Sequence, residues 1–323
     1  MEGMGRFIVR RLIGMVAVLF AISVLVFLIF NVVPNSDPAL RIGGKNADAQ
    51  LIARINKDWG FNDPLPEQYL TLMKKTFSGD LVSYQNQRNV IDQIKKGIPV
   101  TFSLCIGAGI IWFMLGVVFG YLSAIRAGRA TDRALTILAL IGISLPVFFL
   151  GEMLLYYVAF KAGLFPVGDY VKFTEDPLQW ANHLILPWFT LAVLFIGFYS
   201  RLLRSNMLDV MDEDYVRTAR AKGLPERQVR LKHVLRNSLI PIITLFGLDF
   251  GAVIGGGAIL TETVYNLPGV GLYAGQAVAS LDLPPLIAIT MFGAFFIVLL
   301  NTVVDIVYAY LDPRIRLGTQ AAT

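Results

Sequence analysis

Long runs of apolar residues, separated by polar segments, dominate the pattern along this chain. A helix that crosses the hydrocarbon core of a bilayer needs about 20 such residues, at ~1.5 Å of rise per residue. Because backbone polar groups in lipid must bond within their own segment, each such run is predicted to be a helix. The sequence therefore predicts an all-α polytopic membrane protein with six transmembrane helices. The runs are residues 12–33, 101–125, 134–160, 184–200, 239–260 and 286–311.

The composition argues against a soluble domain. Hydrophobic residues make up 55% of the 323 residues and charged residues only 16%, which leaves too little polar surface to cover a soluble protein of this size. The first apolar run follows Arg6, Arg10 and Arg11. It is too long for a signal peptide and lacks a cleavage pattern of small residues, so we expect a permanent anchor.

Six membrane crossings assign each loop to one side of the membrane, and lysine and arginine residues are distributed unequally between the two sides. With the N-terminus inside, the inner segments hold 17 of the 28 basic residues, whereas the short outer loops hold Lys161 and Lys172. The other nine lie in residues 34–99, a loop long enough to be translocated regardless of its charge. Both termini are therefore expected in the cytoplasm.

One basic segment separates the fourth and fifth apolar runs. Residues 201–244 hold nine of the 28 basic residues, and Tyr215, Val216, Ala219 and Gly223 recur there at helical spacing. Small residues on such a face would let the backbone of another protein approach closely. A Gly-Leu-Pro sequence then ends the predicted helix, and a second basic helix follows. The alternative is a solvated loop that its charge keeps in the cytoplasm.

The order of residues in this segment resembles the coupling loop of ATP-binding-cassette (ABC) importer permeases. The B-type subunits of the dipeptide and oligopeptide family have a loop close to DYVRTARAKGL followed by HALRNALLP, and this chain reads DYVRTARAKGL at residues 214–224 and HVLRNSLIP at residues 233–241. The general importer signature fits less well, because Arg217 and Thr218 stand where that signature has Glu and Ala. This difference favours the peptide branch, and similar features from FIVRRL near the start to DPRIR near the end extend the resemblance over essentially the whole chain.

The resemblance implies a type I ABC importer permease fold in a bacterial inner membrane, with an extracytoplasmic loop region after the first helix. It implies a complex with a homologous C-type permease, two ATP-binding subunits and an extracytoplasmic solute-binding protein. ATP and Mg²⁺ would bind to the ATP-binding subunits, and this chain would bind no cofactor. It would form half of the translocation path for peptides, with metal chelates or oligosaccharides as alternative solutes.

The resemblance also assigns regions and residues. The expected regions are an N-terminal segment with the first helix (1–33), an extracytoplasmic loop region (34–100), a permease core (101–311) that includes the coupling loop (205–237), and a cytoplasmic tail (312–323). The residues expected to couple the chain to the ATPase are Asp214, Tyr215, Arg217, Ala219, Arg220, Ala221, Lys222, Gly223 and Leu224.

Acidic side chains inside apolar runs are candidates for lining a path. A carboxylate at the centre of a bilayer costs about 2.5–3.5 kcal/mol, so it should face protein or water. Asp249 precedes a glycine-rich stretch and would attract a cationic group such as a peptide amino terminus. Glu152 follows a kink expected at Pro146, whereas Asp305 is expected to make a structural contact. The glycines of residues 255–257 are interpreted as sites of close helix packing.

Two outer segments are expected to have structure of their own. Residues 261–284 have no lysine or arginine and are mildly apolar, which predicts a re-entrant or interfacial segment. A similar stretch in the family lies beside the solute entrance, so Glu262 and Asn266 join Glu152 and Asp249 as candidates for the translocation path. In residues 34–99, a turn followed by a helix predicts either a small cap on the helix ends or a docking surface for the solute-binding protein.

The sequence contains no motif for chemistry by this chain. It has no G-x-x-x-x-G-K-[ST] phosphate-binding loop, and His183 and His233 stand 50 residues apart without neighbouring ligands, so we expect neither a catalytic nor a metal site. Cys105 is the single cysteine and cannot form an intrachain disulfide. A secondary transporter is the other class considered, but three scattered acids and no obvious repeat fit that class poorly.

Overall fold

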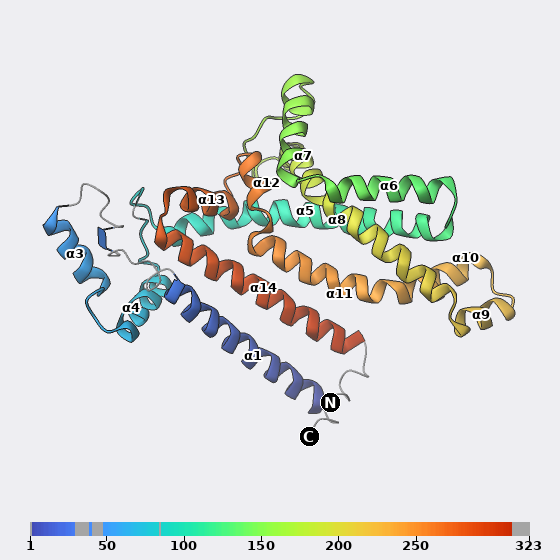
Figure 1. Cartoon of the computed structure of the whole chain (residues 1–323), viewed down its shortest axis with the longest axis horizontal. Helices are drawn as coiled ribbons and strands as arrows, with labels where there is room; N and C mark the ends of the chain where they lie inside the picture. Colours follow the sequence, from blue (N-terminus) through green and yellow to red (C-terminus); the bar gives the residue numbers. More distant parts are fainter. Residues whose placement is uncertain (1, 30–38, 41–47, 84, 312–323) are drawn as a thin grey trace. The chain divides into compact units, whose positions relative to one another are not determined.

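The computed structural model describes residues 2–29, 39–40, 48–83 and 85–311 (Figure 1). This part of the chain is helical, and its one β-pairing is an isolated bridge between Val82 and Asn89. The chain divides into two compact units. The first contains residues 1–101, 254–259 and 268–323, and the second contains residues 102–253 and 260–267.

Five helical stretches in the described residues are long and apolar enough to cross a membrane, and a bent helix pair brings the number to six. The five stretches are Ile8–Phe27, Val90–Ile125, Pro177–Met211, Glu226–Gly257 and Leu283–Ile306.

The bent pair replaces the third expected helix. Instead of one kinked helix over residues 134–160, the structure has Ala130–Ser144 and Val147–Lys161 meeting at 99°. The break follows from Pro146, which lacks an N–H group and disfavours the helical conformation of the residue before it. Leu145 accordingly has φ −80° and ψ 124°. The position predicted for a kink, Pro146, was right, but the prediction of one kinked helix was wrong, because the chain forms two helices there.

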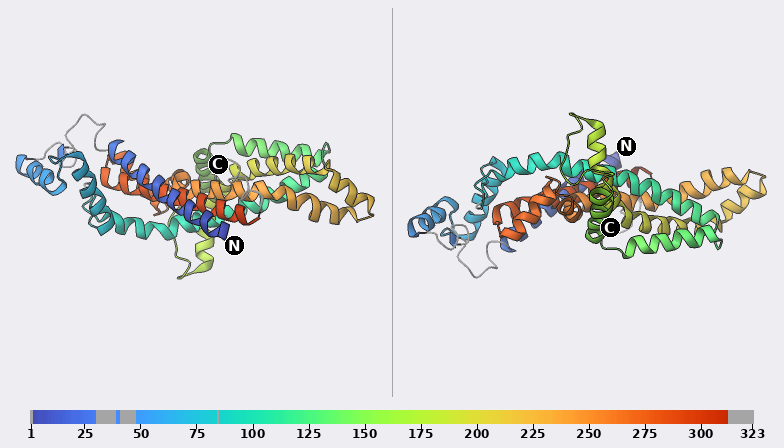
Figure 2. Two further views of the ribbon diagram at one scale, coloured as in Figure 1. Left: turned by 90° about the horizontal axis from the view of Figure 1, so that it is seen from below. Right: turned by 90° about the horizontal axis from the view of Figure 1, so that it is seen from above.

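In the first unit, α1 (Glu2–Phe27) runs beside α14 (Leu283–Leu311), as Figures 1 and 2 show from three directions. Near one end of the pair, Arg11 and Asp305 form an ion pair of 2.6 Å, which confirms the structural contact expected for Asp305. At the other end, Phe27 belongs to a buried apolar cluster with residues of α14. The unit also contains α3 (Ala49–Trp59), α4 (Leu65–Ser78), the first residues of α5 (Val90–Ile125) and α13 (Val270–Ser280).

The expected turn and helix in the outer loop are present. The chain turns at Gly60, whose φ is +64°, and α4 begins after Pro64. Leu72 of α4 is 3% exposed and lies in the same buried cluster as Phe27 of α1, while the hydroxyl groups of Tyr69 and Ser23 lie 2.7 Å apart. This packing favours the cap interpretation of α4.

Close packing is also observed at the glycine-rich stretch. A β-carbon at Gly293 of α14 would collide with the carbonyl group of Gly255, so the two backbones are in direct contact. The adjacent Gly256 has non-helical backbone angles, which ends the helical stretch Glu226–Gly257 earlier than residue 260, the expected end of the fifth apolar run. Two short helices follow in residues 259–280, namely α12 (Ile259–Val264) and α13.

In the second unit, α5, α8 and α11 enclose an aromatic core. Trp112 of α5 is fully buried, and its ring stacks on Phe195 at 4.5 Å and lies against Phe246 and Phe250. Ring contacts of this kind pack the three helices closely together. The helices of this unit are the remainder of α5, α6 (Ala130–Ser144), α7 (Val147–Leu154) with η2 (Leu155–Lys161), α8 (Pro177–Met211), α9 (Asp214–Ala221), α10 (Glu226–Gln228) with η3 (Val229–Leu235), α11 (Arg236–Ala252) and most of α12.

Candidate functional site

The nine residues expected to couple the chain to an ATPase all lie on α9 or directly after it. The carbonyl group of Glu213 accepts the first two hydrogen bonds of this helix, from the N–H groups of Val216 and Arg217. At its other end Gly223 has φ +76° and donates its N–H to the carbonyl group of Arg220 at 2.9 Å. A glycine adopts this left-handed conformation without steric cost, so the predicted end of the helix is confirmed.

The small face of α9 packs against the chain itself. Val216 is fully buried and Ala219 is 6% exposed, whereas Tyr215 is 42% exposed. Val216 and Ala219 are therefore not available to another protein, whereas Tyr215 and Gly223 of the same predicted face remain exposed. The physical reason is length, because a helix of eight residues is not stable in water unless it buries an apolar face. The side chains left outside are polar or basic, and they include Asp214, Arg217, Arg220 and Lys222.

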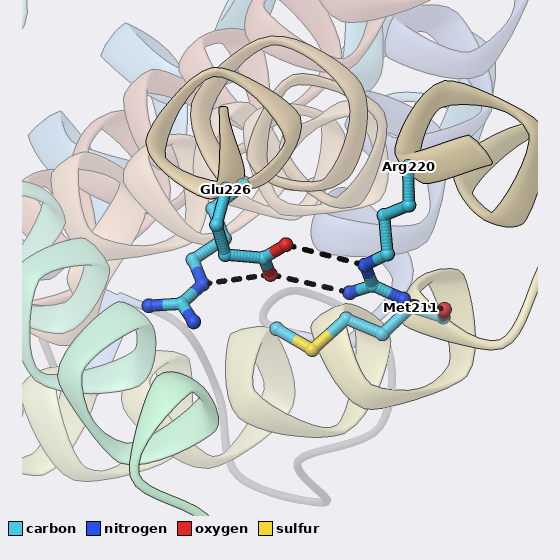
Figure 3. Close-up of polar contacts among 4 residues, drawn as sticks. Met211, Arg220 and Glu226 are labelled. Atoms are coloured by element: carbon cyan, nitrogen blue, oxygen red, sulfur yellow. Dashed lines mark hydrogen bonds and ion pairs between the residues drawn. The ribbon is translucent and has the colours of Figure 1, made fainter. Parts of the chain in front are cut away.

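Glu226 links α9 to the helical segment that follows it. Its carboxylate accepts two hydrogen bonds from Arg220, both at 3.3 Å, and one from Arg230 at 3.0 Å (Figure 3). Arg220 also reaches the carbonyl group of Met211 at the end of α8, at 3.5 Å. These contacts join α8, α9 and the second basic helix, which begins at Glu226 as predicted.

A further contact holds α9 to α11. The side-chain amide of Asn237 donates to the hydroxyl group of Tyr215 at 2.9 Å and to the carbonyl group of His233 at 2.8 Å. Asn237 of α11 thereby orients the exposed side chain of Tyr215 on α9. Sequence reasoning assigned Tyr215 to the site but not Asn237 or Glu226.

A buried ion pair lies in the same unit. Arg204 of α8 donates two hydrogen bonds, of 2.7 and 2.8 Å, to the carboxylate of Asp132 near the start of α6. Asp132 also accepts from the hydroxyl group of Ser123 and from the N–H of Gly128 at 2.8 Å. This arrangement fixes the turn between α5 and α6 to α8. This ion pair was not predicted from the sequence. The position of Asp132 among Arg126, Arg129 and Arg133 was a signal that could have indicated it.

The four candidate path residues have different surroundings. Asp249 on α11 is half-buried and accepts a hydrogen bond of 2.7 Å from the hydroxyl group of Tyr199 on α8. Glu262 on α12 is fully buried, whereas Asn266 directly after α12 is exposed, with φ +49°.

Glu152 on α7 is exposed, and its charge acts on Tyr265, which follows α12. Burial, together with this negative charge, raises the pKa of Tyr265 to about 12, although a hydrogen bond of 2.8 Å with Thr190 acts in the opposite direction. The structure thus brings Glu152 toward the end of α12, where Glu262 and Asn266 lie, and gives Asp249 a separate partner.

No group of three or more His, Cys, Asp or Glu side chains in the described parts of the chain is arranged to hold a metal ion. The contacts that the structure shows at the site are hydrogen bonds and ion pairs between helices. Such contacts are suited to transmitting movement or to binding a polar solute.

Comparison with known proteins identifies a family over nearly the whole length. Residues 116–317 match the family described as binding-protein-dependent transport system inner membrane component, and residues 4–105 match the model for the N-terminal region of such membrane components. The chain is 37% identical over 314 residues to a probable peptide ABC transporter permease protein of Sinorhizobium fredii, covering 97% of this chain and 100% of the relative.

Two further relatives are similar over the same length. A putative peptide transport system permease protein of Brucella abortus is 36% identical over 310 residues, which cover 96% of this chain and 98% of the relative. The glutathione transport system permease protein of Escherichia coli is 36% identical over 311 residues, which cover 96% of this chain and 98% of the relative.

Proposed function

Because the chain belongs to the family of binding-protein-dependent transport system inner membrane components, we propose that it forms half of the translocation path of an ATP-driven importer of peptides. A component of this family is a multi-pass inner membrane protein and is not catalytic by itself. The peptide solute is supported by the names of the relatives from Sinorhizobium fredii and Brucella abortus. The Escherichia coli relative is named for glutathione, which is itself a small peptide.

The proposed complex contains a homologous C-type permease, two ATP-binding subunits and an extracytoplasmic solute-binding protein. ATP and Mg²⁺ would bind to the ATP-binding subunits, since the sequence of this chain has no phosphate-binding loop. The distribution of basic residues supports an orientation with both termini and the coupling loop in the cytoplasm.

The observation that carries the proposal is the attachment of α9. Its apolar face is buried in the chain, and Glu226 and Asn237 join it to the helices on either side. A short helix held in this way moves with α8 and α11 as one body. A force applied to its polar face by an ATP-binding subunit would therefore be transmitted to the membrane helices. Alternating access would follow because the inward-facing and outward-facing states of the complex bind nucleotide with different affinities.

For the path itself, we propose that Glu152, Asp249, Glu262 and Asn266 contribute polar groups. An acidic group attracts the amino terminus of a peptide most strongly where water is scarce, because the interaction increases as the local dielectric constant falls. Metal chelates and oligosaccharides remain the alternative solutes. A solute without a cationic group would not require the negative charge of Asp249.

Site-specific crosslinking tests the coupling role. Lys222→Cys lies on the exposed side of α9, and Ala219→Cys is a matched control on its buried face. The native Cys105 is buried and should not react. In the full complex, benzophenone maleimide attached to the cysteine should, after illumination, join residue 222, but not residue 219, to an ATP-binding subunit. Failure of the Lys222→Cys variant to crosslink in every nucleotide state would contradict the proposal.

A further inference from the structure

Helix α4 lies beside the C-terminal end of α1, within the same unit (Figure 1). Tyr69 contacts α1 at two levels, through the hydroxyl group of Ser23 at 2.7 Å and through the ring of Phe27, whose centroid is 5.5 Å away. Phe27 in turn lies in one buried cluster with Ile287 of α14, four residues into the apolar stretch that begins at Leu283, or about 6 Å along the helix axis. Tyr69 therefore ties α4 to the level at which the hydrocarbon core gives way to lipid headgroups.

Part of the apolar surface of α4 is exposed. Leu70 is 64% exposed and Phe77 is 80% exposed. At about 100° per residue, Pro66, Leu70 and Phe77 fall within about 40° of one another on the helix surface. This exposed arc borders the side on which Tyr69 and Leu72 pack against the unit. α4 thus presents one apolar side to its own unit and an adjoining apolar side outward.

The polar residues beside this arc include an acid as well as a lysine, because exposed Glu67 lies about 20° beyond Lys74 around the helix. Lys74 is exposed and lies about 40° beyond Leu70 around the helix, where its flexible stem extends from the apolar arc toward polar surroundings. On the other side, the ammonium group of Lys75 stands 4.1 Å from the ring centre of Trp59, and burial lowers the pKa of Lys75. Tryptophan, tyrosine and lysine together are typical of the boundary between a membrane and water.

We propose that α4 is an interfacial helix that inserts Leu70 and Phe77 among lipid acyl chains and binds the phosphate of an anionic phospholipid through Lys74. The leaflet is the one at the C-terminal end of α1, opposite the Arg11–Asp305 ion pair. Two exposed large side chains are too small a surface for a stable protein interface, which buries about 800 Å² per partner. Partial insertion of an amphipathic helix into lipid has no such requirement, and the positive charge of Lys74 complements a lipid phosphate.

Fluorescence quenching tests the orientation of α4. Phe77→Cys and the neighbouring control Ser78→Cys are each labelled with bimane in the full complex, which is reconstituted in vesicles of phosphatidylethanolamine and phosphatidylglycerol. A phospholipid that carries a nitroxide near its headgroup should quench the label at residue 77 several-fold more than the label at residue 78. Aqueous iodide should give the reverse order.

Native mass spectrometry tests lipid binding. Lys74→Glu should reduce the phosphatidylglycerol retained by the complex several-fold, whereas Lys57→Glu, the same change at an exposed lysine of α3, should not. The proposal is overturned if iodide reaches residue 77 as readily as residue 78 and the lipid quencher reaches neither. It is also overturned if both quenchers are excluded from residue 77, which would show that a protein partner covers α4.

Discussion

Gly223 combines a positive φ of +76° with open space around the position of a β-carbon. A substitution there meets no neighbouring atom, so its effect arises from the backbone conformation alone. Left-handed backbone costs about 1–2 kcal/mol for most residues and less for asparagine. The sequence showed that a glycine ends this helix, but the open surroundings were visible only in the structure.

We expect Gly223→Val to assemble poorly or to uncouple the complex, because a branched side chain opposes the left-handed turn that ends α9. Gly223→Asn is the matched control and should retain most of the activity. The measurement is ATP hydrolysis by the reconstituted complex with and without its solute-loaded binding protein. Normal solute stimulation in the valine variant would contradict the coupling role of this turn.

Asp132 is the most buried acid in the ion pairs of the described residues, and its side chain is 6% exposed. Arg204→Met would leave this carboxylate buried and unpaired, which lowers the free energy of unfolding by about 3–5 kcal/mol. The double variant Asp132→Asn with Arg204→Met removes both charges and should recover part of the loss. Thermal unfolding of the purified protein compares the three chains, and equal stability of the single and double variants would refute this account of the pair.

At the scale of elements, α9 depends on its neighbours more than on its own sequence. Its eight residues are too few for a stable isolated helix, and the contacts of Val216 and Ala219 with the rest of the unit compensate. Periodicity correctly placed these residues on one face. It could not say whether that face meets this chain or another protein, because either would bury the same apolar side chains.

The exposed ion pairs of Glu226 should stabilise α9 only modestly. Glu226→Gln weakens the contacts with Arg220 and Arg230, and exposed pairs contribute about 0.2–1 kcal/mol. Hydrogen exchange of the α9 amides should therefore accelerate by at most about fivefold. Glu213→Gln is a suitable control, because the side chain of Glu213 makes no capping hydrogen bond with α9. Equal exchange rates in the two variants would show that Glu226 does not hold the loop.

The bend between α6 and α7 is a second element-scale result. Pro146 predicts a break in the helix, but its angle of 99° is far larger than the kink expected from a proline alone. Gly151 of α7 packs closely against Val264 and Thr190, from α12 and α8. Contacts of this kind set the direction of α7, and they join residues that are distant in the sequence.

At the scale of the whole molecule, this chain should transport nothing by itself. Vesicles that contain the full complex, with the solute-binding protein outside in its physiological orientation, should accumulate a labelled dipeptide only when ATP and Mg²⁺ are supplied. Omission of the ATP-binding subunits, or of the second permease, should abolish uptake. Uptake driven by a proton gradient without ATP would contradict the importer mechanism and favour a secondary transporter.

By itself the sequence determined the class of this protein, the approximate position of its membrane helices and its family. Long apolar runs in lipid leave the backbone no alternative to a helix, and the order of residues 214–224 resembles that of the peptide-permease family. It also located the end of α9 at Gly223, because conformational preference at such a turn is local.

Only the tertiary structure decided which face of α9 is buried, how sharply the chain bends after Leu145, and which groups hold the coupling loop in place. These properties depend on pairs such as Asp132 with Arg204 and Tyr215 with Asn237. Asp132 and Arg204 lie 72 residues apart in the sequence, and Tyr215 and Asn237 lie 22 residues apart. Local periodicity carries no information about such contacts, because they form only when separate helices pack side by side.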